Sequence, residues 1–521
     1  MFVFHWIVGV LFGAVLLAAL ARRIGAPYPA LLALGGAGLA FVPGVPNLSL
    51  DPELALALFL APVLMDAGYD ISLRDMARNW RPIAGLALGA VLVTTAAVAL
   101  VVRWLVPDMP LSAAIVLGAV VAPPDAIAAL SVLAHVSLPH RLATILRGES
   151  LLNDAGSLLI YRLGVTAAVT GHVSVAEVAP AFLIGVVGSL IAGPLAALVY
   201  LRLLRRFEDT PSTIVVQFAA AFGLWIAAEA IELSGVLTVV SFAITVARRA
   251  PGQTAPRQRV ISNAVWETAI FVLNVLAFVL IGNQIGPILD RLTPEQELSY
   301  ALVAGAVVAT VILVRIAWVL PASALRRWRF EHSGQGAPGP EFGLGAGFAV
   351  SWSGMRGLVT VAAALALPES GPGNGGFPYR DLIVLTAFCV VIGTLVLQGL
   401  TLRPLLARLG LEDADPVGHE VGWARAEAYG AAVETLKDDP SEAADALRRE
   451  FHAALEQARA HGEGLAPEGL PTDAPRRRAV RAARDRIHAL RRSGRIGDDA
   501  YFVLEEELDW AELNATPRAE A

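Results

Sequence analysis

Four polar residues, Glu149, Ser150, Asn153 and Asp154, lie close together in an otherwise apolar segment. If this segment is helical, Ser150 and Asp154 share one face, where a hydroxyl and a carboxylate could hold one ion. Glu149 would lie about 140° around the helix from Asp154, so it could instead pair with a cation on another helix. Asn153, about 100° from Asp154, offers a neutral amide and no second acid. Carboxylate, hydroxyl and carbonyl oxygens suit a hard monovalent cation.

A carboxylate in apolar surroundings must be neutralised, and Asp154 can hold a proton or a metal ion but not both well. That competition is the minimum requirement for exchanging a cation for a proton. Every charged residue within an apolar run is costly in the same way, so each is expected to have a partner or a function. The candidates are Asp66, Asp125, Arg147, Glu149, Asp154, Arg162, Glu267, Arg315 and Arg356.

The composition of the whole chain explains this apolar setting. Hydrophobic residues make up 56% of the 521 residues, charged residues make up 17%, and the mean hydropathy is +0.61. A soluble protein needs more charge than this. Residues 1–409 carry a net charge of +3 and residues 410–521 one of −9, which sum to the −6 of the chain. We therefore expect a membrane domain over 1–409 and a soluble tail over 410–521, with no cofactor and no nucleic-acid partner.

Thirteen apolar ranges are long enough to cross a bilayer of about 30 Å. They lie near 2–20, 27–43, 53–70, 82–106, 112–134, 142–169, 179–201, 213–232, 235–248, 264–286, 298–320, 343–367 and 382–403. Eighteen arginines lie in the connections after odd-numbered ranges and three in those after even-numbered ranges. This bias predicts that the N-terminus is outside and the tail is in the cytoplasm. The first range is interpreted as a span, and not as a removable signal peptide.

Two of the thirteen ranges are interrupted. The fifth contains Pro123-Pro124-Asp125 and the twelfth contains Ser351-Trp352-Ser353-Gly354-Met355-Arg356-Gly357. With six spans in each repeat and one linking span, both breaks fall in the fifth helix of a repeat. This pattern predicts an all-α polytopic membrane protein with inverted six-helix repeats, whose two broken helices meet at the membrane midplane. Asp125 could then offset exposed N–H groups, and Arg356 exposed carbonyl groups.

Four segments carry a resemblance to a known family: Leu60 to Gly68, Ala122 to Ala126, Gly148 to Asp154, and Gly354 to Gly357. They resemble the bacterial sodium/proton antiporters of the cation/proton antiporter-1 family, which are related to animal sodium/proton exchangers. The resemblance also includes Trp266-Glu267 and extends through all thirteen ranges. It implies a secondary transporter of the plasma membrane, acting in pH homeostasis as a homodimer with alternating access.

The resemblance also implies roles for individual residues. Asp154 would carry the proton and Na⁺ (or Li⁺) in turn, with Ser150 and Asp66 as further ligands of the ion. Glu149 would pair with Arg356, and Asn153 would indicate electroneutral exchange. Many members of the family have Thr-Asp-Pro where this chain has Pro124-Asp125-Ala126. The carbonyl of Pro124 therefore remains as a possible ligand, whereas a threonine side chain is missing.

The sequence leaves several alternatives open. A K⁺/H⁺ or broad monovalent cation/H⁺ antiporter would use the same residues. An intramembrane aspartyl enzyme could use Asp125 and Asp154 as its pair of acids, and a passive channel is a third possibility. For the tail, an internally paired helical hairpin is favoured over a basic segment that contacts anionic lipid.

Overall fold

The computed structural model describes residues 2–24, 26–42, 52–125, 139–170, 175–207, 209–250, 255–332, 343–368, 376–411, 416–460, 472–493, 495–496 and 498–516. The secondary structure of these residues is helical throughout, and the described ranges contain no strand. The chain divides into two compact units, Met1–Glu412 and Asp413–Ala521. The predicted all-α class is therefore confirmed.

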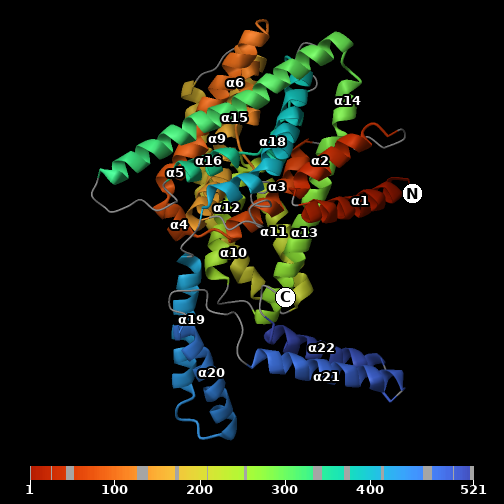
Figure 1. Cartoon of the computed structure of the whole chain (residues 1–521). Helices are drawn as coiled ribbons and strands as arrows, with labels where there is room; N and C mark the ends of the chain where they lie inside the picture. The colour runs from red at the N-terminus through yellow and green to blue at the C-terminus, as the bar shows by residue number, and fades with distance from the viewer. Residues whose placement is uncertain are drawn as a thin grey trace. The chain divides into compact units, whose positions relative to one another are not determined.

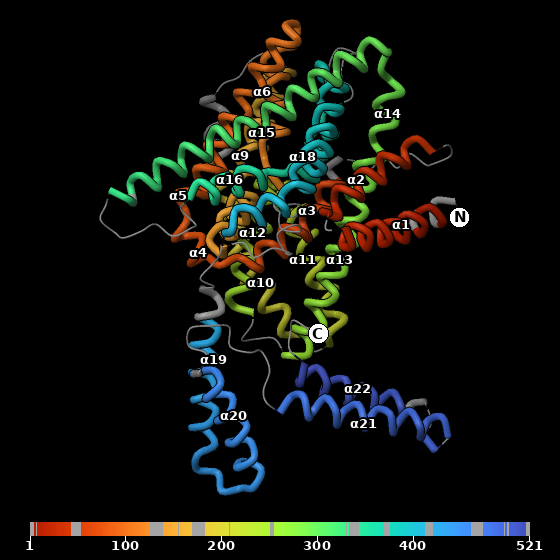
Figure 2. The backbone as a smooth tube through the Cα atoms, in the orientation of Figure 1, coloured from red at the N-terminus to blue at the C-terminus, as the bar shows by residue number. Residues whose placement is uncertain are grey.

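The helices of the first unit follow one another with short connections (Figures 1 and 2). They are α1 (Phe2–Ile24), α2 (Tyr28–Leu39), α3 (Pro52–Tyr69), α4 (Leu73–Arg78), α5 (Trp80–Ala84), the π-helix η1 (Gly85–Ala90), α6 (Val91–Leu105), α7 (Leu111–Val121), α9 (His140–Thr170), α10 (Val175–Leu204), α11 (Thr210–Ala230), α12 (Gly235–Arg249), α13 (Pro256–Asn283), α14 (Ile285–Leu289), α15 (Pro294–Glu331), α16 (Leu344–Trp352), α17 (Leu358–Leu365) and α18 (Arg380–Leu409).

These helices coincide with the thirteen apolar ranges, although the second half of the fifth range lies outside the described residues. Six are long and apolar enough to cross a membrane: Trp80–Leu105, Leu183–Leu204, Thr210–Ala230, Pro256–Leu289, Pro294–Arg329 and Arg380–Leu409. Tyr28–Leu39, Leu54–Tyr69 and Leu111–Val121 are shorter apolar helices. A multi-pass membrane protein is thus supported, while thirteen crossings and inverted repeats stay predictions.

Local signals in the sequence set several helix ends. The Asp209 carboxylate accepts a hydrogen bond of 2.8 Å from the Ser212 amide and caps the N-terminus of α11. The Ser234 hydroxyl accepts one from the Leu237 amide at the start of α12. Gly410 ends α18 in the left-handed conformation, at φ +55°. Short polar side chains at N-caps and glycine after the C-terminus satisfy backbone groups that the helix leaves unpaired.

Both predicted breaks are present. Helix α7 ends at Val121, and the backbone is not helical from there to Asp125. Helix α16 ends at Trp352, and α17 begins only at Leu358. The long helix α15 runs obliquely across this region and packs against α6, α16 and α18 (Figure 1).

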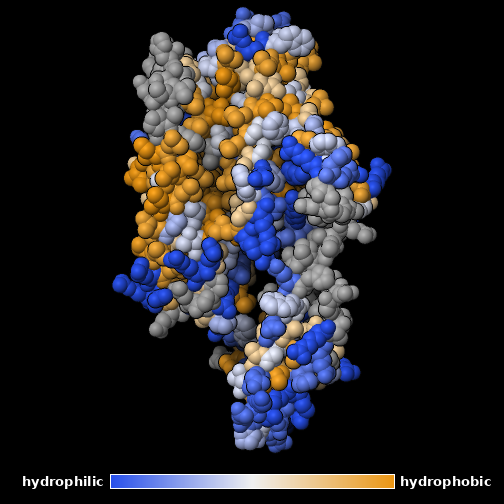
Figure 3. All heavy atoms as spheres, turned by 90° about the vertical axis from the view of Figure 1, so that its left-hand side faces the viewer, coloured by the Kyte–Doolittle hydropathy of each residue, from blue (hydrophilic) through white to orange (hydrophobic). Residues whose placement is uncertain are grey.

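The outer surface of the first unit is strongly apolar. Figure 3 shows hydrophobic side chains gathered over a broad face of this unit. On α10, Ile184, Leu195 and Val199 are between 57% and 68% exposed, and Leu100 and Trp104 on α6 are more exposed still. Side chains of this kind are stable when exposed to lipid, which agrees with a membrane domain.

The second unit consists of two helical pairs. Helices α19 (Pro416–Thr435) and α20 (Glu442–Ala460) lie side by side, as do α21 (Asp473–Arg492) and α22 (Asp498–Asn514). Arg484 on α21 pairs with Asp509 at 2.6 Å, and also with Glu505 and Glu512 on α22. The predicted internally paired hairpin is therefore confirmed for α21 and α22.

Helices α2 and α13 approach each other more closely than side chains would allow. A Cβ atom at Gly36 would overlap the Val279 carbonyl oxygen, and one at Gly282 would overlap the Ala33 carbonyl oxygen. Each glycine thus lets the backbone of the opposite helix into the space that a side chain would occupy.

We expect Gly36→Ala and Gly282→Ala each to lower the free energy of unfolding by about 1–3 kcal/mol, because the added methyl group must push the backbones apart. Gly305→Ala is the matched control, since Gly305 lies in α15 with no atom within 4 Å of the new Cβ. Thermal unfolding of the purified protein in detergent measures the difference. Equal midpoints for all three variants would contradict this account of the contact.

Candidate ion site

Helix α9 is continuous from His140 to Thr170, so the helical spacing expected for its polar residues holds. The side chains of Glu149, Asn153 and Asp154 are 1%, 0% and 5% exposed, and Ser150 is half-buried. Ser150 and Asp154 share a face, because they are four residues apart on this helix. Two carboxyl groups and an amide are thus buried within about one and a half turns of α9.

Arg356 connects the two helix breaks. Its Nε donates to the Val121 carbonyl at 3.0 Å, and its Nη2 donates to the Ala122 carbonyl at 3.1 Å. Its Nη1 donates to the Gly354 carbonyl. These carbonyls lie at the C-terminal ends of α7 and α16, where helix hydrogen bonds run out. Arg356 thus donates to carbonyl groups that the two breaks leave without helical partners.

Asp125 belongs to the first break, but it lies against Gly357, the residue at which α17 begins after the second break. Its backbone amide donates to the Met355 carbonyl at 2.7 Å, which joins the two interrupted segments directly. A Cβ atom at Gly357 would overlap the Asp125 carboxylate, so this carboxylate packs against the backbone at the N-cap of α17. A negative charge is favourable next to the positive end of a helix dipole. This agrees with the role expected for Asp125 at exposed N–H groups.

The expected pair of Glu149 and Arg356 is wrong, because Glu149 binds Arg315. Arg315 Nη1 and Nη2 donate to Glu149 Oε1 and Oε2 at 2.5 and 2.8 Å, in a bidentate pair. Arg315 also donates to the Val350 carbonyl at the end of α16. The guanidinium passes over Gly354, where a Cβ atom would overlap it. Arg356 lies within electrostatic range of Glu149 but gives its hydrogen bonds to carbonyls.

Asp154 differs from Glu149 in having no such partner. Among the described residues, it makes neither a hydrogen bond nor an ion pair, and its nearest electrostatic neighbour is another acid, Asp125. Asn153 Nδ2 donates to the Pro124 carbonyl at 3.0 Å, and its Oδ1 has no hydrogen-bond partner among the residues that the structure describes. Four of the residues named from the sequence therefore come together where α9 meets the first break. They are Asp154, Asn153, Pro124 and Asp125.

Asp66 lies apart from this group. It is exposed on α3 within an open cavity of about 830 Å³, where its electrostatic neighbours are Asp70 and Glu267. No hydrogen bond or ion pair joins Asp66 to Asp154 in the described part of the chain. The ligand set of Asp154, Ser150 and Asp66 therefore stays a prediction.

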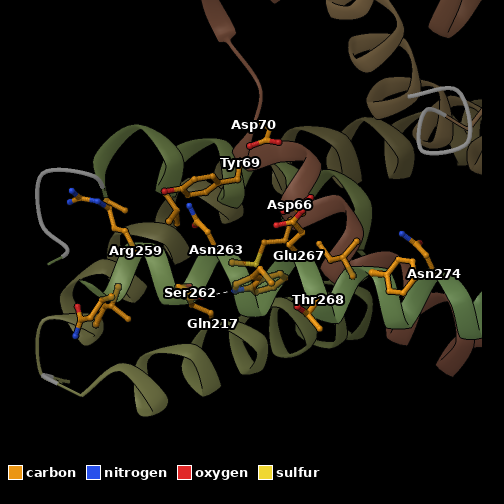
Figure 4. Close-up of a pocket in the computed structure, with 18 of the residues that line it drawn as sticks. Asp66, Tyr69, Asp70, Gln217, Arg259, Ser262, Asn263, Glu267, Thr268 and Asn274 are labelled. Atoms are coloured by element: carbon orange, nitrogen blue, oxygen red, sulfur yellow. Dashed lines mark hydrogen bonds between the residues drawn. The ribbon is translucent and has the colours of Figure 1, made fainter. Parts of the chain in front are cut away.

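The cavity has two polar walls (Figure 4). On α3, Asp66, Tyr69 and Asp70 are spaced to lie on one face. On α13, lining residues recur at Arg259, Asn263, Glu267, Phe271 and Asn274. This stripe covers about 22 Å, from fifteen residues at about 1.5 Å each. Figure 4 shows Arg259 and Asn274 at opposite ends, with Asp66 and Glu267 next to each other between them.

Tyr28 lines this cavity and lies within electrostatic range of Asp125. Sequence reasoning missed both Tyr28 and Asn274, because neither carries a charge that would stand out in an apolar range. The three- and four-residue spacing of polar positions on α13 was a signal that could have found Asn274. Arg315 was noted as a charge in a span, but its partner could not be read from spacing.

Residues 10–408 match the family model described as "Sodium/hydrogen exchanger, transmembrane", which covers well over half of the chain. The chain belongs to this family. The resemblance stated from the sequence is therefore confirmed.

Individual relatives fit this assignment. The chain is similar to a sodium, potassium, lithium and rubidium/H⁺ antiporter of Bacillus subtilis, with 31% identity over 79% of this chain and 62% of the relative. The chain thus spans less than two thirds of the length of that relative. An uncharacterized Na⁺/H⁺ exchanger of Mycobacterium tuberculosis is 30% identical over 98% of both chains. The solved sodium proton antiporter MjNhaP1 of Methanocaldococcus jannaschii has a similar fold, with a TM-score of 0.61 and 15% identity over 79% of this chain and 99% of that one.

We expect Glu149→Gln and Arg315→Met each to lower the free energy of unfolding by about 3–5 kcal/mol, because each leaves a buried charge uncompensated. The double variant should recover most of this loss. Arg162→Met is the control: it breaks a pair with Glu229 in which the two side chains are 61% and 38% exposed, and should cost under about 1 kcal/mol. Thermal unfolding in detergent is the measurement. If Glu149→Gln/Arg356→Met recovered more stability than Glu149→Gln/Arg315→Met, the pair of Glu149 and Arg356 expected from the sequence would be correct after all.

Proposed function

We propose that this protein exchanges Na⁺ (or Li⁺) for H⁺ across the plasma membrane, with Asp154 as the shared carrier. One observation carries the proposal: Asp154 is a buried carboxylate without a cationic partner among the described residues, whereas Glu149 on the same helix is neutralised by Arg315. A buried carboxylate needs a proton or a cation to balance its charge. Competition between the two at one group couples their movements.

The arrangement around Asp154 supports a cation site in several ways. Neutral oxygens near this acid come from the Pro124 carbonyl, from the half-buried Ser150 and from Asn153 Oδ1, which accepts no hydrogen bond from the described part of the chain. Asp125 adds a second negative charge, and it also balances the N-terminus of α17. Arg356 is held by carbonyls at the crossing, so its hydrogen bonds are committed away from the carboxylate that receives the ion.

Access to the site is proposed to come through the cavity of Asp66 and Glu267. Arg22 and Arg259 also line it, and both belong to connections that the arginine bias predicts to be cytoplasmic. In this proposal, the cavity faces the cytoplasm, and its acids attract cations. Asp66 then acts at the entrance in this conformation and could join Asp154 only after a movement.

A broad monovalent cation/H⁺ antiporter, including K⁺/H⁺ exchange, is the second candidate. It is favoured by the printed name of the Bacillus subtilis relative, which includes potassium and rubidium. Membership of the exchanger family supports a secondary transporter over the aspartyl enzyme considered from the sequence. We also propose a homodimer, an external N-terminus, and an exchange domain at 1–409 followed by a cytoplasmic tail at 410–521.

We expect Asp154→Asn to abolish exchange, because an amide cannot alternate between a proton and a cation. Proton efflux from proteoliposomes holding the full chain, measured by recovery of a quenched ΔpH dye on adding Na⁺, Li⁺ or K⁺ separately, is the assay. Asp108→Asn, an exposed acid outside this site, is the matched control and should keep the wild-type rate. A wild-type protein that gives no recovery with any cation between about pH 6 and 9 would overturn the proposal.

We expect the exchange to be electroneutral, because Asn153 is neutral and only Asp154 changes partner. With an imposed membrane potential, the wild-type rate should therefore stay within about twofold of the rate measured without a potential. Asn153→Asp places a second acid beside Asp154 and should make the rate respond to the potential if the variant is active. A wild-type rate that depends strongly on the potential would contradict one-for-one exchange.

A further inference from the structure

The inner end of the cavity contains two polar groups that have no role in the site so far. Asn274 on α13 is 4% exposed, and Tyr28 is half-buried at the start of α2. Both line the cavity, and Figure 4 shows Asn274 at the end opposite Arg259. Asn274 is the last polar residue of the stripe on α13 that lines the cavity, and Tyr28 reaches the cavity from α2.

The two residues are held close to each other and to the site. The Tyr28 ring packs on the Phe271 ring with centroids 5.9 Å apart, and Phe271 precedes Asn274 by one helical turn. The Tyr28 hydroxyl neighbours the Asn274 amide and lies within electrostatic range of Asp125. Asp125 in turn neighbours Asp154. From the cavity to Asp154, each of these polar groups therefore lies within electrostatic range of the next.

The support beneath this pair is rigid. Tyr28 begins α2 and Asn274 lies on α13, and these two helices touch backbone to backbone at Gly36 and Gly282. The hydroxyl and the amide thus keep their spacing by packing, and no ion pair is needed. A hydroxyl and an amide can each replace part of the water around a cation or pass on a hydrogen bond.

We propose that Tyr28 and Asn274 form the polar entry step through which cations and protons pass from the cavity to Asp125 and Asp154. This inference rests on the proposed function. Neither residue is a carrier: both position and partly desolvate the ion before it reaches the carboxylates. Without them, an ion that leaves the cavity for the carboxylates would lack two polar groups that replace part of its water, at a higher cost.

The test uses the full chain in proteoliposomes, with proton efflux measured against Na⁺ concentration at several pH values. Tyr28→Phe keeps the ring on Phe271 and removes only the hydroxyl, and Asn274→Leu removes only the polar end of a side chain of similar size. Each should raise the half-saturating Na⁺ concentration about tenfold, the effect of one lost hydrogen bond. The maximal rate should stay within about twofold of the wild-type value, and the pH dependence of the exchange rate should differ from that of the wild type.

Two control variants distinguish an effect on ion entry from a general effect on the fold. Tyr300→Phe removes a tyrosine hydroxyl on α15, outside the cavity lining, and should leave the half-saturating concentration unchanged. Asn274→Ser retains a small polar group and should restore most of the apparent affinity that Asn274→Leu loses. Unchanged half-saturation and pH profile in Tyr28→Phe and Asn274→Leu, with an active wild type, would overturn this inference alone. An inactive wild type would overturn the proposed function and the inference with it.

Discussion

The structure of the first unit depends on satisfying backbone groups where two helices stop inside an apolar domain. Water is not available there, so each exposed carbonyl needs a donor from the protein. Arg356 supplies three donors at once, to carbonyls of Val121, Ala122 and Gly354. The amide of Asp125 adds a direct bond to Met355. Because these donors satisfy the crossing, Pro124 and Asp125 can lie in a non-helical segment. The Pro124 carbonyl there accepts a hydrogen bond from Asn153 on α9, whereas in a regular helix the hydrogen bonds of the helix would occupy it.

The two buried acids of α9 show how burial and pairing divide their roles. Glu149 receives both arms of Arg315, and this pair also reaches Val350 at the end of α16. Its charge is therefore compensated whatever happens at the site, and it fastens α9 to α15 and α16. Asp154 lies only five residues further and faces no cation in the described part of the chain. One helix thus carries a fixed charge that stabilises the fold and a charge that must find its partner from solution, and the proposed exchange requires this contrast.

Much of this could be predicted from local features of the sequence. Apolar length predicted the helices, and proline or glycine clusters predicted the two breaks, because these signals act within a few residues. The carbonyl contacts of Arg356 were only one of two possibilities, because an arginine at a break can bind either the freed backbone or a carboxylate on another helix. The partner of Glu149 did not follow: helical spacing gives the face on which Glu149 lies, but not which of two arginines faces it. Asp66 illustrates the same limit, because its position depends on how α3 packs against α13, which no spacing within α3 determines.

The side of the molecule opposite the cavity sets a condition on any exchange. Two turns beyond Asp154 along α9, Tyr161 packs against a cluster of buried apolar residues that includes Leu117, Val120 and Ile383. This cluster lies around α7 and α18 and closes that direction with hydrocarbon. Under the proposed function, an ion released on that side must pass where these side chains now touch. The polar stripe of α13 has no need to change, because its groups already face the cavity. Asn153 joins α9 to the first break at Pro124, and Glu149 joins it through Arg315 to Val350 on α16. Under the proposed function, opening the second side would therefore require α9 to separate from the apolar side chains of α7 and α18 that Tyr161 now packs against, because the cost of moving an ion through that contact is high.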